Sequence, residues 1–203
     1  MRSALPLLIA ATALLAGCNA QPAAEPSVAE QEAAMRNAAA DLQSWDRVFG
    51  FPSETVAKLN QYGYRLTGYQ AAKTGFDAPG EAITLSQSDA KAPNRGTVSV
   101  TGATADAIDR IVFALPITDD ANAETAKKRL TDIIRAFLFQ YKIEDDGALD
   151  AIAAEQDADG MIGDTPVAIA VDKGEGPRRI TVTFSRPSAT APAAASDGNT
   201  QQP

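Results

Sequence analysis

Histidine is absent from all 203 residues of this chain. The chain therefore cannot form a Ser-His-Asp or Cys-His catalytic relay, a histidine-based zinc site or a histidine pH switch. Cysteine occurs only once, at Cys18, so no intrachain disulfide can form. An enzyme with this composition would have to use carboxylates, lysine, tyrosine or a serine-lysine pair.

The chain also lacks a strongly basic segment. It has 18 Lys and Arg residues against 26 Asp and Glu residues, which gives a formal net charge of −8. Binding to nucleic acid, and adsorption to an anionic membrane surface, both depend on clustered positive charge. We therefore expect no nucleic-acid partner and no purely electrostatic attachment to a membrane.

Only one long apolar run is present, residues 4–15, and it follows Arg2. A membrane-spanning helix needs about 20 apolar residues, so this run has the length of a secretory signal instead. The run ends in Leu15-Ala16-Gly17-Cys18, which resembles the lipobox of bacterial lipoproteins. An ordinary secretion signal that happens to end near a cysteine is the alternative interpretation.

The lipobox resemblance implies that residues 1–17 are removed and that Cys18 carries a diacylglycerol thioether and an acylated amine. The mature chain would then have 17 basic and 26 acidic residues, a formal charge of −9. Its attachment to the lipid bilayer would come from the acyl chains, and several chains give stable anchoring. Asn19 stands where aspartate retains enterobacterial lipoproteins in the inner membrane, so the resemblance favours the outer membrane, facing the periplasm.

The remaining chain is predicted to form one folded domain between two low-complexity segments. Residues 18–34 are Ala-, Pro- and Gln-rich and are expected to be a tether that is partly helical. Residues 35–186 are long enough for one α+β domain with a single core. Residues 187–203 have the composition of a disordered tail.

Alternating apolar residues predict most of the strands. The pattern is clearest at 97–101, 111–115, 167–171 and 180–184, and weaker at 64–69 and 83–85. The stretch 71–80 is rich in Gly, Ala and Pro and is expected to be a loop. Short turns between the strands favour an antiparallel sheet of about five or six strands, with one apolar and one hydroxyl-rich face.

A long helix at about 121–141 is the strongest predicted element, and it is expected to cover one face of the sheet together with shorter helices. Lys127-Lys128-Arg129 is expected to lie on its solvated side. Phe139 is out of register with the apolar stripe. We expect it to meet a short helix at about 148–156, and otherwise to be an exposed contact residue.

Acidic residues between 155 and 164 partly match a calcium-binding loop. Asp157, Asp159 and Asp164 are the weak calcium ligands, but Pro166 stands where a closing glutamate belongs. A polar turn before the next strand is the simpler interpretation. No other metal site and no cofactor is expected.

Seven of the twelve aromatic residues lie between 45 and 76. They are expected mainly to pack helices on the sheet, but Tyr64, Tyr69 and Phe76 are also candidates for contacts with a ligand or a partner, as is Phe139. The favoured hypothesis is a non-enzymatic envelope lipoprotein that binds a protein or a cell-wall partner. A periplasmic carrier of a small ligand is the alternative, and a carboxylate-dependent hydrolase is a third hypothesis.

Overall fold

The computed structural model describes residue 27 and the ranges 45–86, 91–174 and 176–187. Every helix and strand in these ranges belongs to the unit Asn37–Pro203. The predicted signal, Cys18, almost all of the tether and all but one residue of the tail lie outside the described residues. No helix in the described ranges is both long and apolar enough to cross a membrane.

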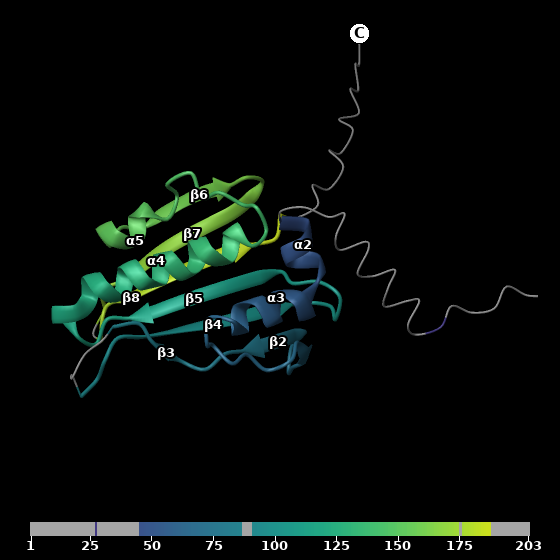
Figure 1. Ribbon diagram of the computed structural model, residues 1–203, viewed down its shortest axis with the longest axis horizontal. Coiled ribbons are helices and arrows are strands. Elements are labelled where there is room, and N and C mark those ends of the chain that lie inside the picture. Colours follow the sequence, from purple (N-terminus) through teal and green to yellow (C-terminus); the bar gives the residue numbers. More distant parts are fainter. Residues whose placement is uncertain (1–26, 28–44, 87–90, 175, 188–203) are drawn as a thin grey trace, which may run out of the picture. The chain divides into compact units, whose positions relative to one another are not determined.

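The described chain contains five helical segments and eight strands (Figure 1). The helical segments are α2 (Trp45–Gly50), α3 (Pro52–Asn60), the 3-10 turn η1 (Asp120–Asn122), α4 (Ala123–Phe139) and α5 (Asp150–Ala154). The strands are β1 (Gln70–Ala71), β2 (Phe76–Pro79), β3 (Ile83–Thr84), β4 (Arg95–Gly102), β5 (Arg110–Pro116), β6 (Ala158–Ile162), β7 (Thr165–Asp172) and β8 (Arg179–Ser185).

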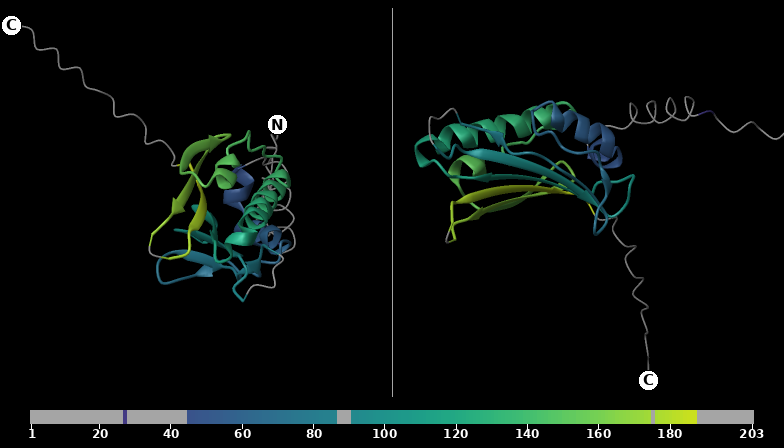
Figure 2. Two further views of the ribbon diagram at one scale, coloured as in Figure 1. Left: turned by 90° about the vertical axis from the view of Figure 1, so that its left-hand side faces the viewer. Right: turned by 90° about the horizontal axis from the view of Figure 1, so that it is seen from below.

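The strands form one antiparallel sheet in the order β1-β2-β4-β5-β8-β7-β6, with β3 paired to β4. The helices lie on one face of this sheet, and α4 runs along it (Figure 2). The predicted α+β class is therefore confirmed. The sheet has more strands than the five or six expected. The strand expected at 83–85 is present as β3 and the one expected at 64–69 is absent, while β1, β2 and β6 form where no strand was expected.

Strand alternation places the core between the sheet and α4. Phe113 on β5 packs against Phe137 of α4 and Phe184 of β8, with ring centroids 6.4 Å and 6.2 Å apart. Trp45 lies on Phe184 at 5.3 Å, and all four rings are buried. Each buried phenylalanine contributes roughly 1.5–3 kcal/mol of hydrophobic stabilisation, so these rings hold helix and sheet together.

The opposite face of the sheet carries small polar and aliphatic side chains. Ser99, Val112, Thr183 and Ala168 are successive partners across four strands and are all half-buried. In the described part of the chain no helix covers this face (Figure 2). The predicted hydroxyl-rich face is thus present.

Two short segments differ from the sequence expectation. Residues 64–69 are not a strand, because Arg65 takes a left-handed backbone angle (φ 47°) that interrupts extended structure. Residues 76–79, expected as loop, form β2 against β4. Pro79 is tolerated there because β1 pairs only with Phe76 and Asp77, so at Pro79 the outer side of β2 has no strand partner in the described sheet.

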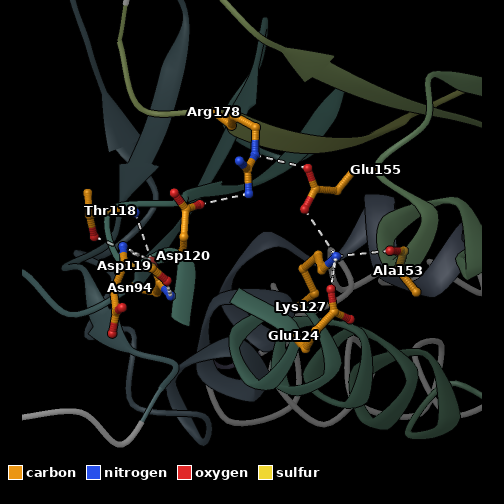
Figure 3. A network of polar contacts seen from close by, with 9 residues as sticks. All are labelled: Asn94, Thr118, Asp119, Asp120, Glu124, Lys127, Ala153, Glu155 and Arg178. Atoms are coloured by element: carbon orange, nitrogen blue, oxygen red, sulfur yellow. Dashed lines mark hydrogen bonds and ion pairs between the residues drawn. The ribbon is translucent and has the colours of Figure 1, made fainter. Parts of the chain in front are cut away.

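Lys127 was expected on the solvated side of the long helix, but it is buried, whereas Lys128 and Arg129 are exposed. Its ammonium lies 2.6 Å from Glu124 and 3.1 Å from Glu155, and it also donates to the Ala153 carbonyl at 3.0 Å (Figure 3). Partial burial tends to lower the pKa of Lys127, but these two carboxylates outweigh it, so the pKa is raised. The lysine thus joins α4 to α5.

The same polar network continues to the sheet (Figure 3). Glu155 also pairs with Arg178 at 3.0 Å, and Arg178 reaches Asp120 of η1 at 2.9 Å. Nearby, buried Asn94 accepts hydrogen bonds from the backbone N–H groups of Thr118 and Asp119, at 2.8 and 2.9 Å. These contacts fix the turn that leads from β5 into α4.

Candidate contact site at the end of α4

Phe139 does not meet α5 as expected, because its side chain is 80% exposed. Residues advance by about 100° per position on an α-helix, so Phe139 lies almost opposite the buried Phe137. Leu149 and Ile152, its expected neighbours, are fully buried without it. A phenylalanine this exposed gains nothing from the core, which makes it a candidate contact residue, the other outcome expected from the sequence.

The chain beyond α4 turns back beside Phe139. The Lys142 N–H bonds the Phe139 carbonyl at 3.0 Å, and Lys142 has a left-handed backbone angle (φ 58°). This turn directs Ile143 into the core, where it is 8% exposed. The helix therefore ends with its last aromatic residue left outside.

Hydrogen bonds between the end of α4 and the residues after α3 fix the surface next to Phe139. The Gln140 side-chain amide donates to the hydroxyl of Tyr62 at 2.6 Å and to the side-chain oxygen of Gln61 at 3.3 Å. Both partners follow directly after α3. Tyr62 is thereby positioned beside the end of α4, and it supplies a second aromatic ring to this surface.

Arg135 organises the acidic loop on the other side of Phe139. Its guanidinium lies 3.0 Å from Asp145 and 2.9 Å from Asp150. Partial burial tends to raise the pKa of Asp145, but the hydrogen bonds and charge of Arg135 outweigh it, and the pKa is lowered. Asp145 is therefore ionised at neutral pH, and its charge is paired with that of Arg135.

Glu144 and Asp146 are the two carboxylates left over. Both are exposed, and neither makes an ion pair with a residue that the structure describes. A shallow hollow of about 690 Å³ lies between this acidic loop and the aromatic side chains. We call this region the Phe139 surface, and its defining residues are Tyr62, Ala136, Phe139, Gln140, Ile143, Glu144 and Asp146. It combines an apolar anchor with two uncompensated negative charges.

Tyr64, one of the aromatic candidates, belongs to the core. It is fully buried and packs edge-on against Phe113, with ring centroids 6.1 Å apart. Its hydroxyl has no hydrogen-bond partner within the described residues, and burial raises the pKa of this phenol. A ligand arriving from solvent cannot reach it in this conformation.

Tyr69 and Phe76 form a stacked pair, with centroids 5.8 Å apart. The Tyr69 hydroxyl donates to the carbonyls of Ala107 at 2.8 Å and Thr104 at 3.2 Å. The pair therefore supports the loop between β4 and β5. Phe139 belongs to a different element, so the structure does not bring the four aromatic candidates together.

The suspected calcium loop has a different structure. Its centre is strand β6, which pairs with β7 and turns at Gly163 (φ 62°). The Asp157 carboxylate accepts the Val171 N–H at 2.6 Å, while Asp159 and Asp164 are exposed. Within the described ranges, no group of three or more acidic side chains is placed to hold a metal ion. The acidic residues at alternate positions, which resembled the ligand spacing of a calcium loop, lie in and next to the edge strand β6.

Searches against protein-family models, curated proteins and solved structures find no match to this chain.

Proposed function

We propose that this protein is a non-enzymatic lipoprotein of the bacterial envelope, anchored through acylated Cys18, that binds a protein partner through the Phe139 surface. The anchoring part is supported by Leu15-Ala16-Gly17-Cys18 at the end of the apolar run. The binding part is supported by one observation above all, the 80% exposure of Phe139 at the end of a helix whose other large apolar side chains are buried.

The chemistry of the Phe139 surface defines the partner. Aromatic side chains supply large contact areas and are enriched among the residues that dominate binding energy. The two unpaired carboxylates, Glu144 and Asp146, favour a partner of opposite charge. The partner is therefore a protein segment that presents an apolar side chain next to lysine or arginine.

A hydrolytic role for the acidic loop is less favourable. A carboxylic acid that protonates a leaving group needs a raised pKa. Asp145 has a lowered pKa because Arg135 holds it, and Asp150 is bound to the same arginine at 2.9 Å. Both carboxylates therefore form ion pairs with Arg135 and hold the loop in place. This arrangement favours a structural role for them over an acid-base role in catalysis.

Lipid anchoring is tested by the Cys18→Ser variant. Radiolabelled palmitate should label the wild-type protein and leave the variant unlabelled. Wild-type protein should sediment with membranes, whereas the variant should be retained as a precursor or released in soluble form. Equal labelling and equal sedimentation of the two proteins would refute the anchor.

Partner binding is tested by affinity purification of the lipidated protein from crosslinked envelopes. Phe139→Ala should reduce recovery of a specific protein by about tenfold or more, as expected for an aromatic anchor. Met161→Ala is the matched control, because Met161 is the other exposed large hydrophobic residue of the described chain, at 54%. Equal recovery with the two variants would contradict binding through Phe139. An adduct that is released only by digestion of peptidoglycan would show that the partner is the cell wall and not a protein.

A further inference from the structure

A polar cleft of about 580 Å³ lies where β4 and β8 end and β5 begins, far along the chain from the Phe139 surface. Its walls include Thr101, Arg110 and Ser185 from the three strands, together with Asp109 and Arg186. Volumes of this size are typical of small-molecule sites.

Sheet register places three of these side chains in one row. Thr101 is the partner of Arg110 across β4 and β5, and Arg110 is the partner of Ser185 across β5 and β8. Directly opposed residues of antiparallel strands project from the same face with Cβ atoms about 4.5–5.5 Å apart. One guanidinium is thus flanked by two hydroxyl groups on the open face of the sheet.

Of the three charged residues in the cleft, Asp109 and Arg186 pair with each other, and Arg110 is left without a partner among the described residues. Asp109 is fully engaged, because one oxygen pairs with Arg186 and the other accepts the Ala103 N–H at 2.7 Å. Arg186 is neutralised by that contact. Arg110 has no ion pair and no side-chain hydrogen bond to any residue in the described ranges. The cleft therefore keeps one net positive charge.

Arg179 is a second arginine on the same face, but it has different cross-strand neighbours. It is also exposed, and its cross-strand partners are Pro116 and Asp172. A carboxylate thus stands directly opposite Arg179, whereas hydroxyl groups stand on both sides of Arg110. Hydroxyl groups donate hydrogen bonds to an anion, but they cannot neutralise the arginine themselves.

We propose that this cleft binds the oxyanion of a small ligand, a carboxylate or phosphate group. Arg110 supplies the planar donor pair that matches such a group, and the Thr101 and Ser185 hydroxyls supply a donor on each side. The overall acidity of the chain repels anions at long range. Selectivity therefore comes from these three contacts. This inference does not depend on the partner proposed for the Phe139 surface.

Amide NMR titrations of the full mature chain with inorganic phosphate, and separately with acetate, test the proposal at constant ionic strength. Saturable shifts should be confined to residues around Thr101, Arg110 and Ser185. Arg110→Gln should weaken binding by at least tenfold, while Arg179→Gln should leave it unchanged. Thr101→Val should give a smaller loss.

Vesicle flotation distinguishes a free anion from a lipid headgroup. Vesicles of phosphatidylglycerol and of phosphatidylcholine are incubated with the unacylated Cys18→Ser chain and with Arg110→Gln and Arg179→Gln made in that same chain, so that the acyl anchor does not carry the protein to the vesicles. Binding that needs Arg110 and phosphatidylglycerol assigns the phosphate to lipid, whereas Arg110-dependent binding of free phosphate or acetate alone assigns it to a soluble ligand. The proposal is overturned if no probe binds saturably, or if the two arginine variants lose binding equally.

Discussion

Lys127 and Lys128 are neighbours on α4 with opposite environments. Lys127 is buried among Glu124, Glu155 and a backbone carbonyl, whereas Lys128 forms an exposed pair with Asp132 at 2.7 Å. Removing one member of a buried ionic cluster costs about 3 kcal/mol, while an exposed pair contributes under about 1 kcal/mol. Lys127→Met should therefore lower the free energy of unfolding far more than Lys128→Met.

Denaturant titration of both variants measures this difference. The Lys128→Met variant has the same change in side-chain type on the same helix, so it controls for helix propensity and net charge. Similar unfolding free energies for the two variants would mean that the lysine network does not join α4 to α5.

A substitution at Tyr64 is predicted to stabilise the protein instead. Its buried hydroxyl has no partner within the described residues, and an unsatisfied buried polar group costs about 1–3 kcal/mol. Tyr64→Phe keeps the edge contact with Phe113 and should raise the free energy of unfolding. Thermal and urea unfolding measure the change, and a clear loss of stability would show that the hydroxyl has a partner after all.

At the scale of elements, Gly102 fixes how the end of β4 meets its loop. A Cβ atom there would overlap the Ala107 carbonyl and the Tyr69 hydroxyl. Gly102→Ala should therefore destabilise the protein by about 1–3 kcal/mol, the typical cost of overpacking. It should also increase hydrogen exchange in the β4–β5 loop.

Gly176→Ala is the matched control for that substitution, because nothing lies within 4 Å of a Cβ at Gly176. Its effect on stability should be small. If Gly102→Ala is equally harmless, the loop is not held against Tyr69 as the structure shows.

Sequence patterns predicted the elements that carry their own periodicity. The apolar alternation at 111–115 and 180–184 and the stripe of the long helix all mark elements that are present. Strands β2 and β6 were missed, because each is short and contains Pro or Gly. In the described sheet, strand β6 pairs on one side only, and β2 has only the two-residue β1 on its outer side, so the tertiary partner decides their structure. The same limit applies to Lys127, whose burial depends on Glu155 from another element.

The candidate site was predicted in part. The register of α4 identified Phe139 as out of step with the core, which required only helix geometry. The acidic neighbours of the Phe139 surface depend on a left-handed turn at Lys142 and on the Arg135–Asp145 pair. Neither has a signal in the local sequence, because both result from packing between α4 and the chain that follows it.

For the whole molecule, the absence of histidine predicts a broad stability plateau. Glu155 has a pKa below its ordinary value of 4.5: burial opposes this, but Lys127 outweighs it. Its contribution is therefore complete above that value and is lost as the pH falls through the folded pKa. Lys127 has a pKa above 10.5, so its contribution is complete below that value and is lost as the pH rises through the folded pKa.

Melting temperature should accordingly change little between about pH 6 and pH 9, since the chain has no histidine and its one thiol, Cys18, is acylated in the proposed mature protein. It should fall on acidification below about pH 4.5, because the unfolded chain then binds protons at carboxylates such as Glu155 and Asp145, whose pKa values are lowered in the folded protein. Differential scanning calorimetry at a series of pH values from about 3 to 9 measures the melting temperature. A steep dependence near pH 7 would contradict the assigned ionic network.

At the same scale, the central claim is that a lipid anchor presents the Phe139 surface to a basic, apolar protein segment. Site-specific photocrosslinking in intact cells tests it most directly, with the photoreactive residue at position 139 and, as control, at position 161. Position 139 should give one discrete protein adduct that weakens when Glu144 and Asp146 are changed to lysine. No adduct at 139, or the same adducts at both positions, would contradict the claim.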